Sequence, residues 1–212
     1  MSLRDSKGTP EPVRRLLDCL IRLPGIGKRS AERITFFLIK DATEQALELS
    51  KSIADVKQRV VCCDICNNIA DTAPCLICQD AQRDASMVLV VEQPRDLIQL
   101  EGTGMYKGVY HVLTGRIDPL AGVEPSDLTV DALLERVDHC ERNARNVQIK
   151  EVILGLNPNL EGDSTSLYLA SVLASRGIKV TRLSRGLPSG SQIEYANTQV
   201  LADAIAGRHG ME

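Results

Sequence analysis

Two Cys-x-x-Cys pairs separated by a short loop constrain this chain more than any other sequence feature. The pairs are Cys63 with Cys66 and Cys75 with Cys78. Each pair can form a tight turn that offers two thiolates, and the short connection lets both turns close on one tetrahedral Zn²⁺ ion. Four thiolates leave no open position for water. We therefore expect one structural zinc ion per chain and no catalysis at this site.

Two other uses of paired cysteines fit the pattern less well. A thioredoxin-like redox site has one such pair, on the first turn of a helix that follows a strand. A disulfide framework is disfavoured by the odd total of 7 cysteines and by the absence of any sign of secretion. Cys62 leaves an alternative register open, because it could pair with Cys66 in place of Cys63. The two-residue spacing makes the better metal-binding turn.

Composition limits the location and the partners of the chain. The sequence has no apolar run of about 18 residues or more, and its N-terminus lacks the apolar stretch of a signal peptide. We therefore expect a cytoplasmic protein, which suits reduced cysteines. The net charge of −3 argues against a generally basic surface. Any binding of nucleic acid must then come from local basic patches.

A Pro-Gly-Ile-Gly turn at residues 24–27 joins two expected helices near the N-terminus. Apolar residues recur at helical spacing after Pro12, and a second helix is expected over residues 28–39. This order of helix, turn and helix resembles the helix-hairpin-helix DNA-binding motif. Gly25 and Gly27 let the backbone approach a phosphate closely, and the free N–H groups at the start of the second helix would face that phosphate.

Three basic residues, Lys28, Arg29 and Arg33, follow this turn. Such cations contact the DNA backbone and not the base edges, so we expect binding that is independent of sequence and sensitive to salt. The alternative is an ordinary helical hairpin with a solvated basic face. Under either interpretation, Cys19 is expected to pack beside the apolar stripe of the first helix. The neighbouring zinc module favours DNA binding.

The second half of the chain alternates strands with helices, which predicts an α/β layer with a mainly parallel sheet. Strands are expected at 87–91, 110–113, 151–155 and 179–183, and helices at 94–101, 129–146 and 164–175. A further helix at 43–58 leads to the cysteines, and a helix at 195–206 ends the chain. Neither a dinucleotide-binding Gly-x-Gly-x-x-Gly nor a P-loop lysine motif follows any strand. The three histidines, His111, His139 and His209, show no metal spacing and receive no role.

Taken in order, several motifs are similar to those of the RecR family of bacterial recombination mediators. They are Leu23–Gly27, the four paired cysteines, Val90–Glu92, Tyr110–Leu113, Asn157–Asp163 and Arg185–Pro188. The resemblance implies an α/β multi-domain fold in four parts. These are a helix-hairpin-helix domain (1–57), a four-cysteine zinc finger (58–84), a Toprim domain (85–184) and a C-terminal helical arm (185–212). It also implies a homo-oligomer, from a dimer to a ring-like homotetramer that encircles DNA. RecO and RecF are the implied partners, which help to load RecA at gaps.

The Toprim resemblance raises the question of catalysis. Toprim enzymes such as topoisomerases and primases place a Glu after the first strand and an Asp-x-Asp after a later one, and these carboxylates hold Mg²⁺. Glu92 fills the first position, but the later strand is followed by Asn157-Pro-Asn159. Neutral amides replace anionic ligands poorly. We therefore expect a DNA-repair scaffold and not an enzyme, and the alternative is a Mg²⁺-dependent Toprim nuclease or topoisomerase-like enzyme.

Four acidic residues are candidates for a vestigial Toprim site that receives a basic partner such as RecO. They are Glu92, Asp96, Glu161 and Asp163, at the carboxyl ends of the expected strands. The other interpretation is that these residues cap helices or lie in loops, and the sequence does not decide between the two.

Overall fold

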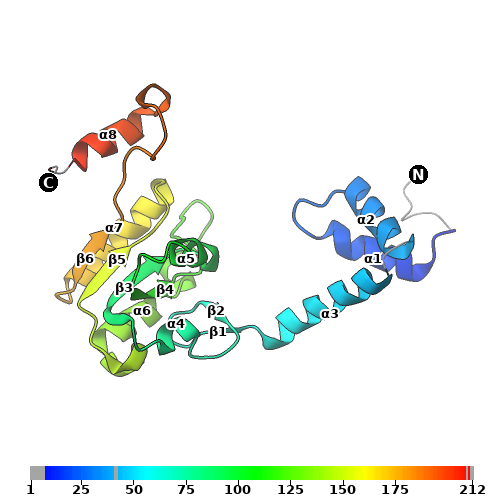
Figure 1. Ribbon diagram of the computed structural model, residues 1–212, viewed down its shortest axis with the longest axis horizontal. Helices are drawn as coiled ribbons and strands as arrows, with labels where there is room; N and C mark the ends of the chain where they lie inside the picture. The colour runs from blue at the N-terminus through cyan, green and yellow to red at the C-terminus, as the bar shows by residue number, and fades with distance from the viewer. Residues whose placement is uncertain (1–7, 41–42, 209, 211–212) are drawn as a thin grey trace. The chain divides into compact units, whose positions relative to one another are not determined.

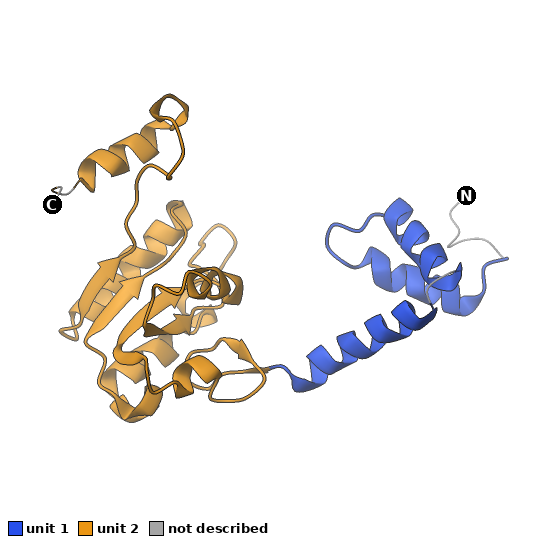
Figure 2. Cartoon of the chain, in the orientation of Figure 1, with its two compact units in different colours: residues 1–60 blue, residues 61–212 orange. Residues whose placement is uncertain are grey.

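The computed structural model describes residues 8–40, 43–208 and 210. The chain divides into two compact units, residues 1–60 and 61–212 (Figure 2). Within the described residues, no helix has the length and apolar character needed to cross a bilayer.

The described residues of the first unit form three helices: α1 (Glu11–Ile21), α2 (Lys28–Lys40) and α3 (Thr43–Arg59) (Figure 1). α1 and α2 pack against each other, and Leu17 of α1 and Ala31 of α2 are buried. Cys19 is exposed on α1, so the expectation that it packs beside the apolar stripe is wrong. α3 has no buried residue, and its predicted apolar face, with Leu49 and Ile53, is exposed.

The second unit begins with the cysteine-rich segment. Two short antiparallel strands, β1 (Val61–Cys62) and β2 (Ile69–Ala70), precede the single-turn helix α4 (Leu76–Gln79). The four paired cysteines belong to the same buried cluster as the core of the following α/β layer. The segment is therefore packed against that layer through its sulfur-bearing side chains.

A four-stranded parallel sheet forms the centre of this unit, as predicted. Its order is β4 (Gly108–Val112), β3 (Asp84–Val91), β5 (Glu151–Leu154) and β6 (Lys179–Arg182). Alternate residues of a strand point to opposite faces of a sheet. On one face Leu89 and Val91 pack with Leu97 of α5 (Pro94–Glu101). On the other, Val88 and Val90 join α6 (Val130–Asp138), α7 (Leu160–Ala174) and the cysteines in one cluster.

The predicted helix over 129–146 is wrong in its second half, because α6 ends at Asp138. Two 3₁₀ turns follow, at Cys140–Arg142 and Ala144–Asn146. The Asn143 side chain donates to the backbone carbonyls of Ala85 (2.8 Å) and Val147 (2.6 Å). Asparagine side chains that bond to backbone groups in this way compete with helix formation.

α7 begins at Leu160, earlier than the predicted start at residue 164, because the Asn159 side chain accepts the N–H of Gly162 (2.8 Å) and caps the helix. Asn197 caps the C-terminal helix α8 (Thr198–Ala206) in the same way. Further 3₁₀ turns lie at Pro125–Asp127 and Ile193–Tyr195.

Candidate functional site

The turn between α1 and α2 presents backbone to solvent. Gly25 has a φ of +79°, a left-handed conformation that side chains with a Cβ rarely adopt. The N–H of Ile26 closes the turn on the carbonyl of Leu23 (3.1 Å), and Ala31 makes the first bond of α2 with Gly27 (2.9 Å). A Cβ at Gly27 would meet no heavy atom within 4 Å, so the space in front of this residue is open.

The cations predicted to bind DNA lie on the first two turns of α2, after this open turn. Lys28, Arg29 and Arg33 are all exposed on α2, and Arg22 is exposed just before the turn. Within the described residues, no ion pair with a carboxylate is recorded for Lys28, Arg29 or Arg33. The first turn of a helix also leaves N–H groups without intrahelical acceptors, and its dipole favours an anion. The arrangement is chemically suited to a phosphate.

The four paired cysteines bring their sulfurs together. All four Sγ atoms lie within 4.8 Å of one another and are buried. The Sγ atoms of Cys66 and Cys75 are 3.6 Å apart, and those of Cys63 and Cys78 are 3.9 Å apart. Tetrahedral Zn²⁺ with bonds of about 2.3 Å places its sulfurs about 3.8 Å from one another. The spacing of the donors therefore fits a metal site with four cysteine ligands.

Local backbone geometry holds the two ligand turns. In the first, Asn67 has a φ of +59°, and its N–H bonds to the carbonyl of Cys63 (3.0 Å). In the second, the N–H of Cys75 donates to the Cys63 sulfur (3.3 Å). Hydrogen bonding among the sulfurs lowers the pKa of the Cys63 thiol and raises the pKa of the Cys66 thiol. Cys62 is exposed in β1 and is not among the clustered sulfurs.

The acidic residues lie at the carboxyl ends of the strands but do not form one cluster. Glu92 follows β3 and is 3% exposed, and its carboxylate accepts the N–H of Asn157 (2.7 Å), which follows the adjacent strand β5. Arg116 lies 3.8 Å from the Glu92 carboxylate and 4.0 Å from that of Glu161. The structure thus brings Glu92 and Glu161 to a common guanidinium. No motif singles out Arg116 in the sequence, since it lies in a loop that only the tertiary fold places here.

The other two acidic residues have separate partners. Asp96 accepts the backbone N–H of Gln93 (2.9 Å) in a capping box at the start of α5. Asp163 pairs with Arg185, whose Nη1 donates to it over 3.0 Å. These hydrogen bonds hold the pKa of Asp163 below its ordinary value. Both side chains therefore stabilise local structure.

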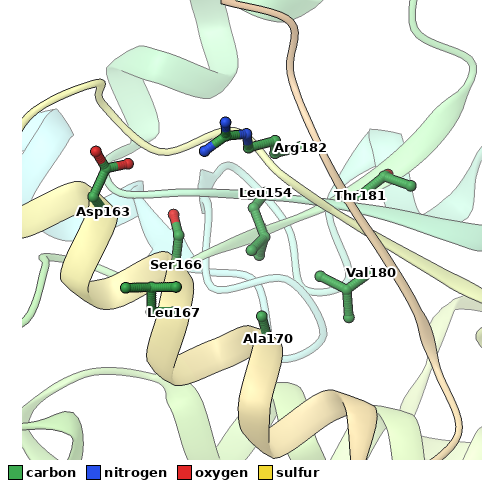
Figure 3. Close-up of a pocket in the computed structure, with 8 residues that line it drawn as sticks. All are labelled: Leu154, Asp163, Ser166, Leu167, Ala170, Val180, Thr181 and Arg182. Carbon is green, nitrogen blue, oxygen red and sulfur yellow. The ribbon is translucent and has the colours of Figure 1, made fainter. Parts of the chain in front are cut away.

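A largely apolar pocket of about 550 Å³ lies elsewhere, between α7 and the edge strand β6. Figure 3 shows Asp163, Ser166 and Arg182 at its polar end, whereas Leu154, Ala170 and Val180 form its apolar part. Among its described lining residues no nucleophile is paired with a base, and Asp163 is the one predicted site residue in that lining.

Comparisons with known proteins match both halves of the chain. A family model described as "RecR, helix-hairpin-helix" matches residues 13–57, and one described as "Toprim domain" matches residues 86–184. The "Recombination protein RecR" of Rhodopirellula baltica is 47% identical over 91% of this chain and 94% of its own. The proteins of the same name from Bifidobacterium adolescentis and Moorella thermoacetica are each 45% identical, over 94% and 96% of this chain and 96% and 98% of their own. With two matching domains and identity at this level over nearly the whole length, the chain belongs to the RecR family.

Proposed function

We propose that this protein is a DNA-repair and recombination mediator that binds the DNA backbone without sequence specificity and catalyses no reaction on it. The observation that carries the proposal is the open turn at Gly25 and Gly27, with Lys28, Arg29 and Arg33 exposed around it. Cations without carboxylate partners remain available to phosphates. The relatives are named recombination proteins, which supports the same role for this chain.

The metal of the four-cysteine site is Zn²⁺ in this proposal, held by Cys63, Cys66, Cys75 and Cys78. A set of four thiolates within 4.8 Å of one another, with two of the sulfur pairs 3.6 and 3.9 Å apart, suits zinc. When bound, the ion supplies a rigid cross-link between the two ligand turns. The four-part division into residues 1–57, 58–84, 85–184 and 185–212 belongs to the same proposal, with the zinc finger packed on the Toprim core.

The absence of catalysis is supported by the surroundings of Glu92. A Toprim enzyme needs clustered carboxylates that are free to hold Mg²⁺. Here the guanidinium of Arg116 lies 3.8 Å from the Glu92 carboxylate and 4.0 Å from that of Glu161, and a cation at this position disfavours the binding of a second one. Asn157 and Asn159 are neutral. The second candidate, a Mg²⁺-dependent Toprim nuclease or topoisomerase-like enzyme, is favoured only by the retained, buried Glu92.

Assembly and partners complete the proposal. The protein acts in the cytoplasm as a homo-oligomer, up to a tetrameric ring around DNA, with RecO and RecF in the loading of RecA. Exposed apolar side chains on α3, such as Leu49 and Ile53, support self-association, because monomers rarely expose contiguous apolar surface. The carboxylates of Glu92 and Glu161 at the sheet edge offer a site for a basic partner.

A retention assay on two forms of one plasmid tests the clamp. The protein is loaded at low salt on nicked circles and on linearised molecules, and the salt is then raised to about 0.5 M to screen the phosphate contacts. A closed ring stays on the circles and slides off the free ends of the linear form. Equal release from both forms would show that the protein does not encircle DNA.

A further inference from the structure

Arg136 is a buried cation without an anionic partner among the described residues. It lies on α6 with 2% of its surface exposed. Its guanidinium donates to the Tyr110 carbonyl (2.9 Å), to His111 Nδ1 (3.0 Å) and to the Asn143 side-chain oxygen (2.9 Å). Its Nε has no hydrogen-bond partner in the described part of the chain. All three acceptors are neutral. Within the described residues, no negatively charged group therefore lies at hydrogen-bond distance from this guanidinium.

His111 cannot supply the missing negative charge. Its Nε2 lies 3.0 Å from the carbonyl of Thr129, which fixes the proton on Nε2 and leaves Nδ1 to accept from Arg136. Burial, with the nearby Arg136, lowers the pKa of His111 to about 3, so the ring is neutral near pH 7. A buried charge is costly unless an opposite charge lies near it. The fold must therefore offset the Arg136 charge elsewhere.

The four-cysteine segment and this guanidinium both bond to the backbone of β4, two residues apart. Arg136 bonds to Tyr110 of β4, and two residues further along the strand the N–H of Val112 donates to the Cys66 carbonyl (2.8 Å). The next residue on α6, Val137, belongs to the same buried cluster as all four cysteines. Burial lowers the pKa of Arg136, and the negative charges of the cysteine sulfurs act in the opposite direction.

A second guanidinium approaches the same site. Arg145 has a left-handed φ of +54°, and this conformation directs its side chain to the backbone of the ligand segment. Its Nη1 donates to the carbonyl of Cys78 over 3.0 Å, and its Nη2 donates to the carbonyl of Arg83. One Zn²⁺ and four thiolates carry a net charge of about −2. The guanidinium groups of Arg136 and Arg145 supply the positive charge that balances this centre.

We propose that Arg136, assisted by Arg145, is the counter-ion of the four-cysteine metal centre and a positioning residue for metal retention. This inference rests on the proposed zinc site. The anionic metal centre and the buried guanidinium of Arg136 neutralise each other inside one core, so neither remains a buried charge without an opposite charge near it. Residues outside the ligand set that stabilise a bound metal typically change its affinity by about 10–100-fold.

Zinc release from the folded protein tests the proposal. Wild type, Arg136→Met, Arg136→Lys and Leu133→Ala are mixed with a chromogenic chelator at a temperature where each retains its native circular-dichroism spectrum. Leu133 is fully buried on the same helix. Leu133→Ala therefore removes buried side-chain volume and leaves the charge unchanged, which makes it the packing control. We expect Arg136→Met to release zinc at least about tenfold faster than wild type. Arg136→Lys should remain close to wild type, because it keeps the charge. Leu133 belongs to the same buried cluster as the cysteines, so Leu133→Ala measures the effect of packing loss alone, and it should release zinc more slowly than Arg136→Met.

Release from Arg136→Met no faster than from Leu133→Ala would overturn the proposal. If Arg136→Met does not fold, Arg145→Met replaces it, since Arg145 is only partly buried. That variant should release zinc faster than wild type, and an unchanged rate would count against the counter-ion role. A wild-type protein that neither contains nor takes up zinc would instead refute the metal site itself, which distinguishes the two failures.

Discussion

Removal of Arg29 and Arg33 should make DNA binding less sensitive to salt. Both side chains are exposed on α2 just after the Gly25–Gly27 turn. Each phosphate contact contributes about 0.9 to the slope of log affinity against log salt on duplex DNA, so the double alanine variant should lose about 1.8 from that slope. Between about 50 and 200 mM salt, the wild type should therefore lose about 12-fold more affinity than the variant.

Fluorescence anisotropy with a labelled duplex measures this effect over several salt concentrations. The matched control is Arg142→Ala with Lys150→Ala, which removes the same charge from exposed positions before β5 in the other unit. The control should keep the wild-type slope, because these residues are not expected to contact phosphate. If both double variants lower the slope equally, binding depends on net charge alone. An unchanged slope in the Arg29 and Arg33 variant would refute the role of the turn.

Three further predictions concern the turn, the metal and the core. Gly27→Ala should alter the free energy of unfolding by less than about 1 kcal/mol, since a Cβ there has no neighbour within 4 Å. The added methyl group should nevertheless weaken DNA binding, because it blocks the close approach of a phosphate. Equal affinity of the variant and the wild type in a DNA titration would contradict this. Cys66→Ser should lose stoichiometric zinc and lower Tm by at least about 5 °C, as measured by metal analysis and calorimetry. Full retention of zinc would contradict the assignment of Cys66 as a ligand of a structural zinc ion. His111 has a folded pKa of about 3, below its unfolded value, so its contribution to stability is complete above about pH 6.5 and is lost as the pH falls toward 3. From about pH 7 to about pH 5.5 the wild type should therefore lose about 1.3 kcal/mol more than His111→Gln in urea unfolding. Identical pH dependence would show that the pKa of His111 is the same in the folded and unfolded states.

Features that depend on local sequence could be predicted. The spacing of Cys63, Cys66, Cys75 and Cys78 fixes two short turns, and the structure brings these four sulfurs together. The apolar run at 87–91 predicts a buried parallel strand, because both faces of such a strand are covered. β3 extends from Asp84 to Val91 and is paired on both sides.

Features that depend on long-range contacts could not be predicted. Asn143 lies in the irregular segment after α6 and donates to the carbonyl of Ala85, a partner 58 residues away in the sequence. Arg116 and Arg136 reach Glu92 and the four-cysteine region only through the tertiary fold. In the sequence they resemble ordinary surface cations. Their positions change the interpretation of both sites, because each adds a positive charge near residues that the sequence alone identifies only as possible metal ligands.

The most direct test of a DNA-binding protein without catalytic activity is a plasmid assay in Mg²⁺ that scores retardation and nicking on the same gel. The account predicts retardation that grows with protein concentration and no nicking at any concentration. Glu92→Gln should behave like the wild type in this gel. Nicking that disappears in Glu92→Gln would contradict the account, because it would show that Glu92 serves a working Toprim centre despite Arg116 and the two asparagines.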